Sequence, residues 1–270
     1  QLEPNNSQGE LYLTDIVEKA VRDNVSIASF ICKNSAEVMG INDKNNLAGA
    51  ERAYQLKIAD ELMTNGLTIK DPNRFDCRGN LIFGNDCIID VNVIFEGEVK
   101  LGKNVLISPN CIIKNSKIGD NSHIMPNSII EDSVIGSHTS IGPFARIRPE
   151  TQIGSHAKIG NFVEVKKSII DDNSKVSHLS YIGDSQVGKA VNIGAGVITC
   201  NYDGVNKSQT TIGDGAFIGS NSQLIAPVSI GKNATIGAGS TITQDAPDEK
   251  LTLSRNKQST MSKWKRPQKK

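Results

Sequence analysis

An aliphatic residue followed by glycine returns every six residues along much of this chain. Because an α-helix has about 3.6 residues per turn, a six-residue spacing would scatter these side chains around a helix and leave no apolar face. A period of six with a branched aliphatic residue at its first position is typical of a parallel β-helix. An ordinary all-β sandwich is the alternative. The clearest pairs are Ile135-Gly136, Ile141-Gly142, Ile153-Gly154, Ile159-Gly160, Ile212-Gly213, Ile218-Gly219, Ile230-Gly231 and Ile236-Gly237.

The hexapeptide register also predicts where the core lies. Each hexad is expected to supply one short strand and a turn, and about three hexads close one coil around stacked aliphatic side chains. Steps of five, as between Ile130 and Ile135, are expected to be shortened corners. The predicted fold is mainly β, a left-handed parallel β-helix, which is an exception to the right-handed crossover rule. The predicted inward residues are Ile89, Phe95, Leu101, Ile107, Ile141, Ile147, Ile153, Ile159, Val165, Val176, Ile182, Ile193, Ile212, Ile218, Leu224, Ile230, Ile236 and Ile242.

Composition and charge narrow the function classes. Of the 270 residues only 4% are aromatic, which suits a core of stacked Ile and Val. The net charge is +1, and residues 255–270 contain seven Lys and Arg without an acid. This basic tail lacks a nucleic-acid recognition motif and is predicted to be a solvated end. Five cysteines without a CxxC pair indicate a reducing, cytoplasmic setting, and no segment reaches the length of a membrane span.

Before the coils the sequence changes character. Residues 15–22 are predicted to form a helix capped by Asp15, with Glu18 in the capping-box position. Val25 to Cys32 is predicted to be a strand, and residues 46–65 a helix ended by Gly66. The chain opens without an initiator Met, so it is predicted to be a piece of a larger protein. The apolar face expected on the second helix consists of Leu47, Ala50, Tyr54, Ile58 and Leu62.

Three function classes fit a hexapeptide solenoid. By analogy of fold, most such proteins are acyltransferases that use a thioester donor. A second class resembles the metal-dependent carbonic anhydrases, which need three converging imidazoles. His138 and His156 are separated by about one coil and are expected to stack, but no third histidine matches, so they are predicted to be surface residues. The third class is a non-catalytic trimerising module.

Groups suited to thioester aminolysis concentrate between Phe144 and Tyr202. The reaction needs a base for the amine, donors for the oxyanion and, for a phosphorylated acceptor, fixed cations. The run from Thr199 to Lys207 breaks the hexad register, so it is expected to protrude as a loop, where function tends to lie on solenoids. The polar groups in this segment are Arg146, Arg148, Lys166, Lys167, His178, Tyr181 and Asn192.

Several motifs in this order carry a resemblance to a known family. The runs GPFARIRPE, GNFVEVKK, HLSYIGD, VNIGAGVITCNYDGVNK, FIGSNSQLIAPV and LSRNKQ resemble the acetyltransferase domain of bifunctional N-acetylglucosamine-1-phosphate uridyltransferase/glucosamine-1-phosphate N-acetyltransferase. The opening NNSQGELYLTDIVE, GIN and ERAYQ resemble the end of its uridyltransferase domain and the linker helix. The implied division is 1–44 uridyltransferase remnant, 45–66 linker helix, 67–246 β-helix acetyltransferase domain and 247–270 basic tail.

The resemblance implies acetyl transfer from acetyl-CoA to the amine of glucosamine 1-phosphate, in UDP-N-acetylglucosamine synthesis for the bacterial cell wall. It makes His178 the general base. Arg148 and Lys166 would clamp the phosphate, with Lys207 a weaker candidate, and Glu164 is a candidate to orient the imidazole or to pair with a neighbouring Lys. The residues implied to hold the sugar are Tyr181 and Asn192.

The resemblance also implies a donor site. Ser220 is expected where a hydroxyl meets the thioester oxygen, and Cys200 is expected to be a bystander because direct transfer needs no acyl-enzyme. The residues that match acetyl-CoA contacts are Ala195, Asn201, Tyr202, Ser220, Ala238 and Arg255.

The uridyltransferase half is expected to be missing from this chain. Nothing here resembles the Gly-rich loop that binds UTP in the family. Asn42 matches a Mg²⁺ and nucleotide ligand, but one Asn without its acidic partner is not expected to hold the ion. The parent protein would have uridyltransferase activity that this chain lacks. The resemblance further implies a cytoplasmic homotrimer with sites between adjacent β-helices, where the basic tail would cover a neighbour's cofactor.

Overall fold

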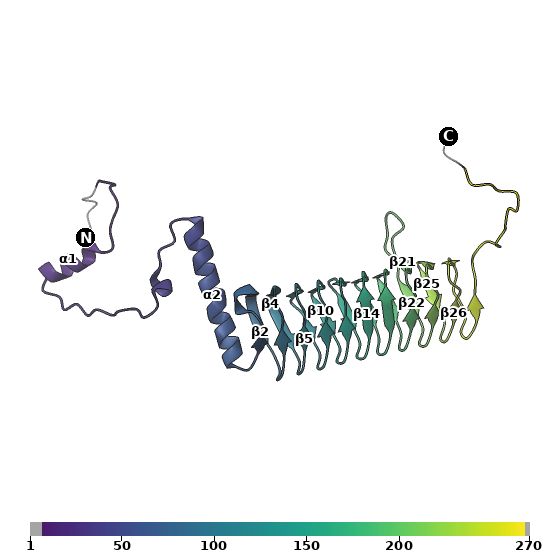
Figure 1. Ribbon diagram of the computed structural model, residues 1–270, viewed down its shortest axis with the longest axis horizontal. Coiled ribbons are helices and arrows are strands. Elements are labelled where there is room, and N and C mark those ends of the chain that lie inside the picture. Colours follow the sequence, from purple (N-terminus) through teal and green to yellow (C-terminus); the bar gives the residue numbers. More distant parts are fainter. Residues whose placement is uncertain (1–6, 268–270) are drawn as a thin grey trace. The chain divides into compact units, whose positions relative to one another are not determined.

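The computed structural model describes residues 7–267 and consists largely of a parallel β-helix (Figure 1). The chain divides into two units, Gln1–Ala53 and Tyr54–Lys270. The second unit contains all the coils, which wind as the predicted left-handed parallel β-helix of hexapeptide repeats. Among residues 7–267, the helices are all too short or too polar to cross a bilayer.

The first unit has little regular structure. It contains the helix α1 (Asp15–Arg22) and the short 3-10 helix η1 (Ser35–Val38). The helix lies where it was predicted, but its N-cap is Thr14, whose side chain makes no capping hydrogen bond, so the predicted Asp15 cap is wrong. The predicted strand Val25 to Cys32 is also wrong. Within the described chain these residues pair with no strand, and a lone strand has no ladder to stabilise it.

The helix α2 (Lys44–Thr64) matches the predicted second helix. Of its predicted apolar face, Ile58 and Leu62 pack against the core of the coils, whereas Leu47 and Tyr54 are exposed. Buried Gln55 instead accepts a hydrogen bond from the backbone N–H of Cys77 at 2.8 Å. The helix thus covers the open end of the first coil and satisfies a donor that the sheet edge would leave unpaired.

Gly66 ends this helix as predicted. Its φ is +101°, a conformation that glycine adopts without steric cost. The N–H groups of Gly66 and Leu67 donate to the carbonyls of Met63 and Leu62 at 2.9 and 3.1 Å. These bonds satisfy carbonyls that the helix leaves free, and they turn the chain toward the first coil. The coil begins with β1 (Thr68–Ile69), which is followed by the 3-10 helix η2 (Pro72–Arg74).

The parallel strand pairs of the coils fall into three series, one for each face of the β-helix. The long strands β2 (Phe75–Ile82) and β4 (Val93–Leu101) each bend across the second and third faces. The first face holds β1, β3 (Ile88–Ile89), β5 (Leu106–Ile107), β8 (His123–Ile124), β11 (Ser140–Ile141), β14 (Lys158–Asn161), β17 (Lys175–His178), β20 (Asn192–Ile193), β23 (Phe217–Ile218), β26 (Thr235–Ile236) and β28 (Leu251–Thr252). The second face continues with β6 (Ile112–Lys114), β9 (Ile129–Glu131), β12 (Arg146–Ile147), β15 (Glu164–Lys166), β18 (Tyr181–Gly183), β21 (Ile198–Cys200), β24 (Gln223–Ile225) and β27 (Thr241–Ile242). The third face continues with β7 (Lys117–Ile118), β10 (Ser133–Ile135), β13 (Thr151–Ile153), β16 (Ile169–Ile170), β19 (Ser185–Val187), β22 (Thr210–Ile212) and β25 (Val228–Ile230).

The core is the predicted stack of aliphatic side chains. Every inward residue predicted from the register is buried, and Ile141, Ile159 and Val176 lie directly above one another on neighbouring strands. Each such side chain contributes about 1.5–3 kcal/mol by its burial. Ile130 and Ile135 are both buried with Asp132 between them at a φ of 42°, which confirms the shortened corner.

The predicted loop leaves the coil after β21. Tyr202 and Lys207 form an isolated antiparallel bridge, so the loop is a small hairpin, and it projects from the coils beside β21 (Figure 1). It returns to the third face at β22. The strands before and after it stay in register, because Gln186 and Thr211 are paired across 25 residues. The hairpin therefore adds a functional segment without disturbing the stack.

Candidate active site

His178 ends strand β17 at the corner between the first and second faces. Its side chain is exposed, and its Nδ1 atom is 2.6 Å from Oδ1 of Asn161, the residue beside it on β14. Because an amide oxygen only accepts hydrogen bonds, this contact places the imidazole proton on Nδ1. In the neutral tautomer that this bond favours, Nε2 carries the lone pair, which is the arrangement a general base needs.

Four of the six predicted donor-site residues continue this corner along the axis: Ala195, Ser220, Ala238 and Arg255. Arg255 reaches the same line, where its Nη1 donates to the carbonyl of Ala238 at 2.9 Å. Gly194, next to Ala195, permits this spacing, since a Cβ there would lie 2.6 Å from the backbone nitrogen of Ser220. The carbonyls of His178, Ala195 and Ser220 accept hydrogen bonds at 3.4, 2.7 and 2.8 Å from the N–H groups of Gly196, Asn221 and Gly239 on the next coils. We call His178, Ala195, Ser220 and Ala238 the corner line.

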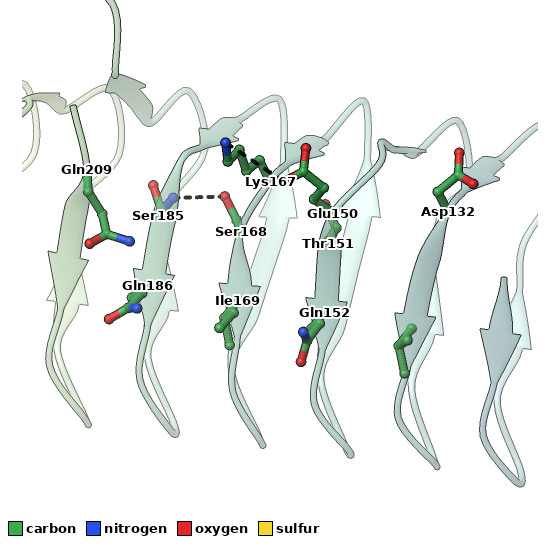
Figure 2. A pocket seen from close by; sticks show the side chains of 11 residues that line it. Asp132, Glu150, Thr151, Gln152, Lys167, Ser168, Ile169, Ser185, Gln186 and Gln209 are labelled. Atoms are coloured by element: carbon green, nitrogen blue, oxygen red, sulfur yellow. Dashed lines mark hydrogen bonds and ion pairs between the residues drawn. The ribbon is translucent and has the colours of Figure 1, made fainter. Parts of the chain in front are cut away.

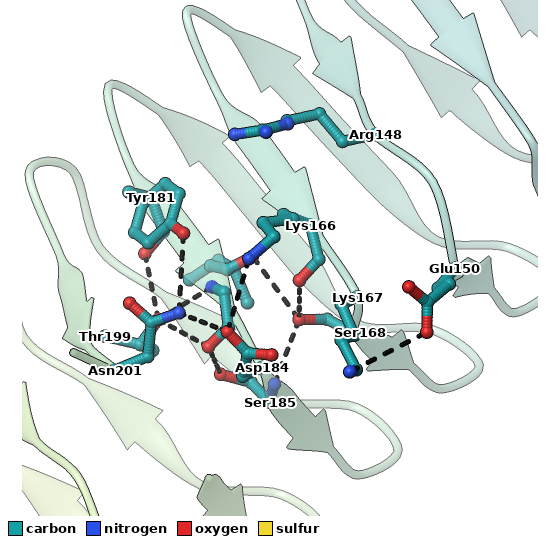
Figure 3. A network of polar contacts seen from close by, with 12 residues as sticks. Arg148, Glu150, Lys166, Lys167, Ser168, Tyr181, Asp184, Ser185, Thr199 and Asn201 are labelled. Carbon is teal, nitrogen blue, oxygen red and sulfur yellow. Dashed lines mark hydrogen bonds and ion pairs between the residues drawn. The ribbon is translucent and has the colours of Figure 1, made fainter. Parts of the chain in front are cut away.

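A second group of predicted residues meets on the second face (Figure 3). Lys166 on β15 is 3.6 Å from Oδ2 of Asp184, which also accepts a hydrogen bond from Nδ2 of Asn201. Nδ2 of Asn201 also lies 3.5 Å from the hydroxyl of Tyr181 on β18. Asn201 is buried and the Lys166 side chain is only 19% exposed. The structure therefore joins Lys166, Tyr181 and Asn201, and adds Asp184, in one polar cluster.

Lys207 brings a second ammonium group to this cluster from the end of the hairpin. Its Nζ lies close enough to that of Lys166 to accept a hydrogen bond when Lys207 is neutral, which lowers the pKa of Lys207 and raises that of Lys166. The negative charge of Asp184 raises the pKa of both lysines, so it opposes the lowering of the Lys207 pKa and adds to the raising of the Lys166 pKa. Two neighbouring cations at the rim of a partly buried cluster are suited to an anion such as a phosphate.

Arg148 lies near this cluster but has its own partner. Its Nη1 is 2.7 Å from Oε1 of Glu164, and this hydrogen bond raises the pKa of Arg148. The carboxylate that was expected either to orient His178 or to pair with a lysine is therefore bonded to an arginine. Asn161, not Glu164, holds the imidazole.

Two predicted residues lie apart from these groups. Asn192 is on β20 of the first face, beside Lys175, whereas Tyr181 and Lys166 are on the second face. Tyr202 is 60% exposed in the hairpin, and its hydroxyl donates to the carbonyl of Gly204. A single chain therefore does not bring all the predicted sugar and acetyl-CoA residues to one point.

Cys200 is the last residue of β21, directly before Asn201. Burial raises the pKa of its thiol. A thiol with a raised pKa holds its proton near neutral pH and is a poor nucleophile. The environment of Cys200 therefore supports the expectation that it is a bystander.

The histidine pair confirms one expectation about the coil. The rings of His138 and His156 stack with centroids 4.6 Å apart and an angle of 3° between their planes. Across residues 7–267, however, no group of three or more His, Cys, Asp or Glu side chains is placed to hold a metal ion. Among the described residues of one chain, the pair therefore has no third side chain placed to complete a zinc site.

Asn42 lies in the first unit, where Ile41, Asn42, Asp43, Lys44 and Leu47 line a pocket of about 380 Å³. The Asp43 carboxylate already accepts a hydrogen bond from the N–H of Asn46 at 2.7 Å. Mg²⁺ needs near-octahedral oxygen coordination, usually from carboxylates and waters. One amide and one engaged carboxylate do not fit this ion by themselves.

Comparison with known proteins identifies the relatives of this chain. Residues 209–244 match the family model described as bacterial transferase hexapeptide (six repeats), and residues 77–151 match the GMPPB C-terminal domain. The bifunctional protein GlmU of Ruthia magnifica subsp. Calyptogena magnifica is 63% identical over 270 residues, which is 100% of this chain and 60% of that protein. The chain is a homologue of the bifunctional GlmU proteins.

Other GlmU proteins agree with this relationship. That of Idiomarina loihiensis is 56% identical over 100% of this chain and 59% of its own length. The chain therefore spans about 60% of the length of the GlmU proteins that it matches, and the matched family models fit their carboxy-terminal acetyltransferase part. The solved structure of an Arabidopsis UDP-N-acetylglucosamine acyltransferase is a distant likeness, with 17% identity over 69% of each chain and a TM-score of 0.45.

Two residues of this GlmU homologue that were missed in the sequence contact the predicted site directly. Asn161 bonds to His178 from 17 residues away, and Asp184 bonds to Asn201 from the same separation. In each pair the two residues lie one coil apart. A search for polar residues one coil before His178 and Asn201 could therefore have found Asn161 and Asp184. The separation alone was not selective, because many polar pairs share it.

A pocket on the third face lies apart from the predicted site (Figure 2). Its volume is about 480 Å³. Glu150 and Lys167 form an exposed ion pair of 3.8 Å at its rim, and the N–H of Ser185 donates to Oγ of Ser168 at 3.0 Å. The lining consists of Asp132, Val134, Glu150, Thr151, Gln152, Lys167, Ser168, Ile169, Ser185, Gln186 and Gln209. Of the polar groups that the sequence analysis connected with acetyl transfer, this pocket contains Lys167 alone, and the residues assigned to catalysis, sugar phosphate or acetyl-CoA lie outside it.

Proposed function

We propose that this chain transfers the acetyl group of acetyl-CoA to the amine of glucosamine 1-phosphate, giving N-acetylglucosamine 1-phosphate. One observation carries the proposal: the imidazole of His178, with its Nε2 free, lies at the corner only three residues before Tyr181, which belongs to the two-lysine cluster. A base at one edge of the second face and lysines at its other edge suit an amine acceptor that carries a phosphate. The names of the relatives support this assignment.

In the proposed reaction, Nε2 of His178 removes a proton as the amine nitrogen attacks the thioester carbonyl. A C–N bond forms, the carbonyl oxygen becomes an oxyanion, and the C–S bond then breaks to release CoA as a thiolate that takes up a proton. Lys166 and Lys207, with Arg148 nearby, hold the phosphate, and Tyr181 and Asn192 hold the sugar. The Ser220 hydroxyl, on the corner line with the base, meets the thioester oxygen.

The donor is proposed to lie along the corner line. Ala195, Ser220 and Ala238 follow His178 on successive coils, and Arg255 closes the line. Asn201 and Tyr202 follow β21 at the base of the hairpin, at the opposite edge of the second face. This order places the thioester end near His178 and leaves Arg255 and the residues after it for the far end of acetyl-CoA.

The assembly is proposed to be a homotrimer with sites between adjacent β-helices. The separation of Asn192 from Tyr181 on two faces of one chain supports this, because a neighbouring copy can supply what one chain does not bring together. We further propose a cytoplasmic enzyme of UDP-N-acetylglucosamine synthesis. Its parent protein is proposed to be bifunctional and to use Mg²⁺ for uridylyl transfer outside this chain.

An assay of CoA release tests the proposed function. We expect acetyl-CoA to be consumed with glucosamine 1-phosphate and much more slowly with unphosphorylated glucosamine, because the lysine cluster acts only on the phosphate. Lys166→Ala should reduce this preference, and Lys167→Ala is the matched control because Lys167 pairs with Glu150 on the exposed rim of the third face. Equal rates with both acceptors would contradict the proposal.

A further inference from the structure

Asp184 lies between side chains assigned to two different substrates (Figure 3). Its Oδ2 atom is 3.6 Å from Nζ of Lys166 and also accepts the hydrogen bond of the Asn201 amide. Its side chain is only 12% exposed, so water screens these contacts incompletely. One carboxylate oxygen therefore joins a proposed phosphate ligand to a proposed acetyl-CoA ligand.

The cluster contains more positive than negative charge without Asp184. Lys166 and Lys207 are in contact, and Arg148 adds a further cation whose charge acts on Lys166. Glu164 is already bonded to Arg148. Like charges this close repel each other, and an acid placed between them offsets the repulsion. Asp184 is the carboxylate in contact with Lys166, and it favours the charged form of both lysines.

The backbone fixes the place of this carboxylate. Asp184 has a φ of 47°, a left-handed conformation that Asp and Asn tolerate better than most residues. Its N–H donates to the carbonyl of Lys166 on the preceding coil at 3.0 Å, and its carbonyl accepts from Thr210 on the next at 3.2 Å. The side chain is therefore held at the corner whether or not a ligand is bound.

We propose that Asp184 is a positioning residue: it supplies the counter-charge that keeps Lys166 and Lys207 together as a clamp for a phosphate monoester, and it ties this clamp to Asn201. The inference rests on the proposed function and deepens it. Asp184 itself touches neither substrate and acts through the three side chains. In this arrangement the acceptor and donor sites share one support.

Two substitutions separate the charge of Asp184 from its hydrogen bond. Asp184→Asn removes the charge but keeps an oxygen for Asn201 and tolerates the left-handed backbone. Asp184→Ala removes both. Glu150→Gln is the matched control, because Glu150 occupies the same corner two coils earlier with a φ of 62° and forms an ion pair with the exposed Lys167. Melting temperatures of all variants show whether the fold is kept.

The pH dependence of acceptor binding is the decisive readout. Loss of a neighbouring negative charge favours the neutral form of a lysine, so in D184N Lys166, whose Nζ is 3.6 Å from this carboxylate, and Lys207 beside it give up their protons at a lower pH than in the unchanged protein. The KM for glucosamine 1-phosphate should therefore begin to rise at lower pH in D184N and be roughly tenfold higher near pH 9. The KM for acetyl-CoA should stay within about twofold in D184N and rise further in D184A, which loses the bond to Asn201.

The outcomes separate this proposal from the proposed function. If D184N keeps the unchanged pH profile, or if E150Q shows the same shift, Asp184 is not the counter-charge and the inference is wrong. If the unchanged protein does not acetylate glucosamine 1-phosphate, the proposed function fails instead. Calorimetric titration with inorganic phosphate then still tests the clamp, since phosphate binding must weaken at a lower pH in D184N than in the unchanged protein.

Discussion

The corner between the first and second faces is built in two ways along the coils. In the early coils Asn92, Asn110 and Asn127 occupy the left-handed position, and their amides form a ladder with bonds of 2.9 and 3.2 Å. In the later coils the ladder stops. The residue before each left-handed position there is either Pro143 or a residue assigned to the candidate site. The later occupants are Phe144, Phe162, Leu179, Gly196, Asn221 and Gly239.

The two stretches share a backbone and differ in what their side chains do. In the early coils the polar side chains at this corner bond to each other between coils, so each Asn of the ladder has a side-chain partner within the β-helix. The later corner leaves polar groups such as Nε2 of His178 and the Ser220 hydroxyl free to meet a ligand. The same corner therefore stabilises the fold in the early coils and carries the candidate site in the later ones. Substitutions in the two stretches are expected to affect stability and activity separately.

The largest effect is expected at the later corner. His178→Ala removes the base, so kcat for acetyl transfer should fall by about 10²–10⁴-fold with little change in stability. His156→Asn is the matched control because His156 is an exposed histidine at another corner and Asn tolerates its left-handed backbone. Full activity in the first variant, measured by CoA release, would mean that another group acts as the base.

A smaller effect is expected one coil earlier, at Asn161. Asn161→Asp places a carboxylate beside the imidazole and stabilises its charged form, so the acid limb of the activity profile should move to higher pH. Activity should fall several-fold near pH 6 and be kept near pH 9. Asn161→Ala should reduce kcat by about tenfold across this range, because the imidazole loses the bond that fixes its tautomer. An unchanged acid limb in N161D would remove Asn161 from the mechanism.

The early corner should respond in stability and not in activity. Asn110→Ala removes two amide bonds of the ladder and puts Ala in a left-handed conformation, which should cost about 1–2 kcal/mol of unfolding free energy. Denaturant unfolding measures this loss, and the acetyl-transfer rate at low temperature should not change. A matching loss of rate would show that the two stretches are not separate.

The smallest effect is expected where the ladder stops. Phe144→Asn would extend the ladder from Asn127 and relieve the left-handed backbone, but it removes the stack with Phe162, whose ring centroid is 5.2 Å away. These terms are each about 1 kcal/mol and oppose each other, so unfolding free energy should change by less than about 1 kcal/mol. A loss above about 2 kcal/mol would show that the lost stack with Phe162 outweighs the gain at the corner.

The sequence predicted the coils well because their signal is local. Each inward Ile or Val is marked by its own hexad, and the break between Ile193 and Ile212 marks the hairpin. The end of α2 was equally local, since Gly66 alone supplies the turn. By contrast, the predicted strand at Val25 failed because a strand depends on a partner elsewhere in the chain.

Contacts between coils were harder to predict because coil length varies. Neighbours across coils are 17 residues apart for Asn161 and His178, and 25 apart for Gln186 and Thr211. A shift of one residue moves a side chain from the outside of a coil to the inside. The role of Asn161 and the pairing of Glu164 with Arg148 therefore became visible only when the coils were stacked.

The corner line also fixes the distance between the two ends of the proposed donor site. Stacked strands are separated by about 4.8 Å, so the three steps from His178 to Ala238 span roughly 14 Å along the axis. A molecule that touches both His178 and Arg255 must therefore be long, extended and parallel to the solenoid. Inserting one whole coil between them would leave the core intact and lengthen the required ligand by about 4.8 Å. The number of coils between His178 and Arg255 therefore sets the length of ligand that can touch both.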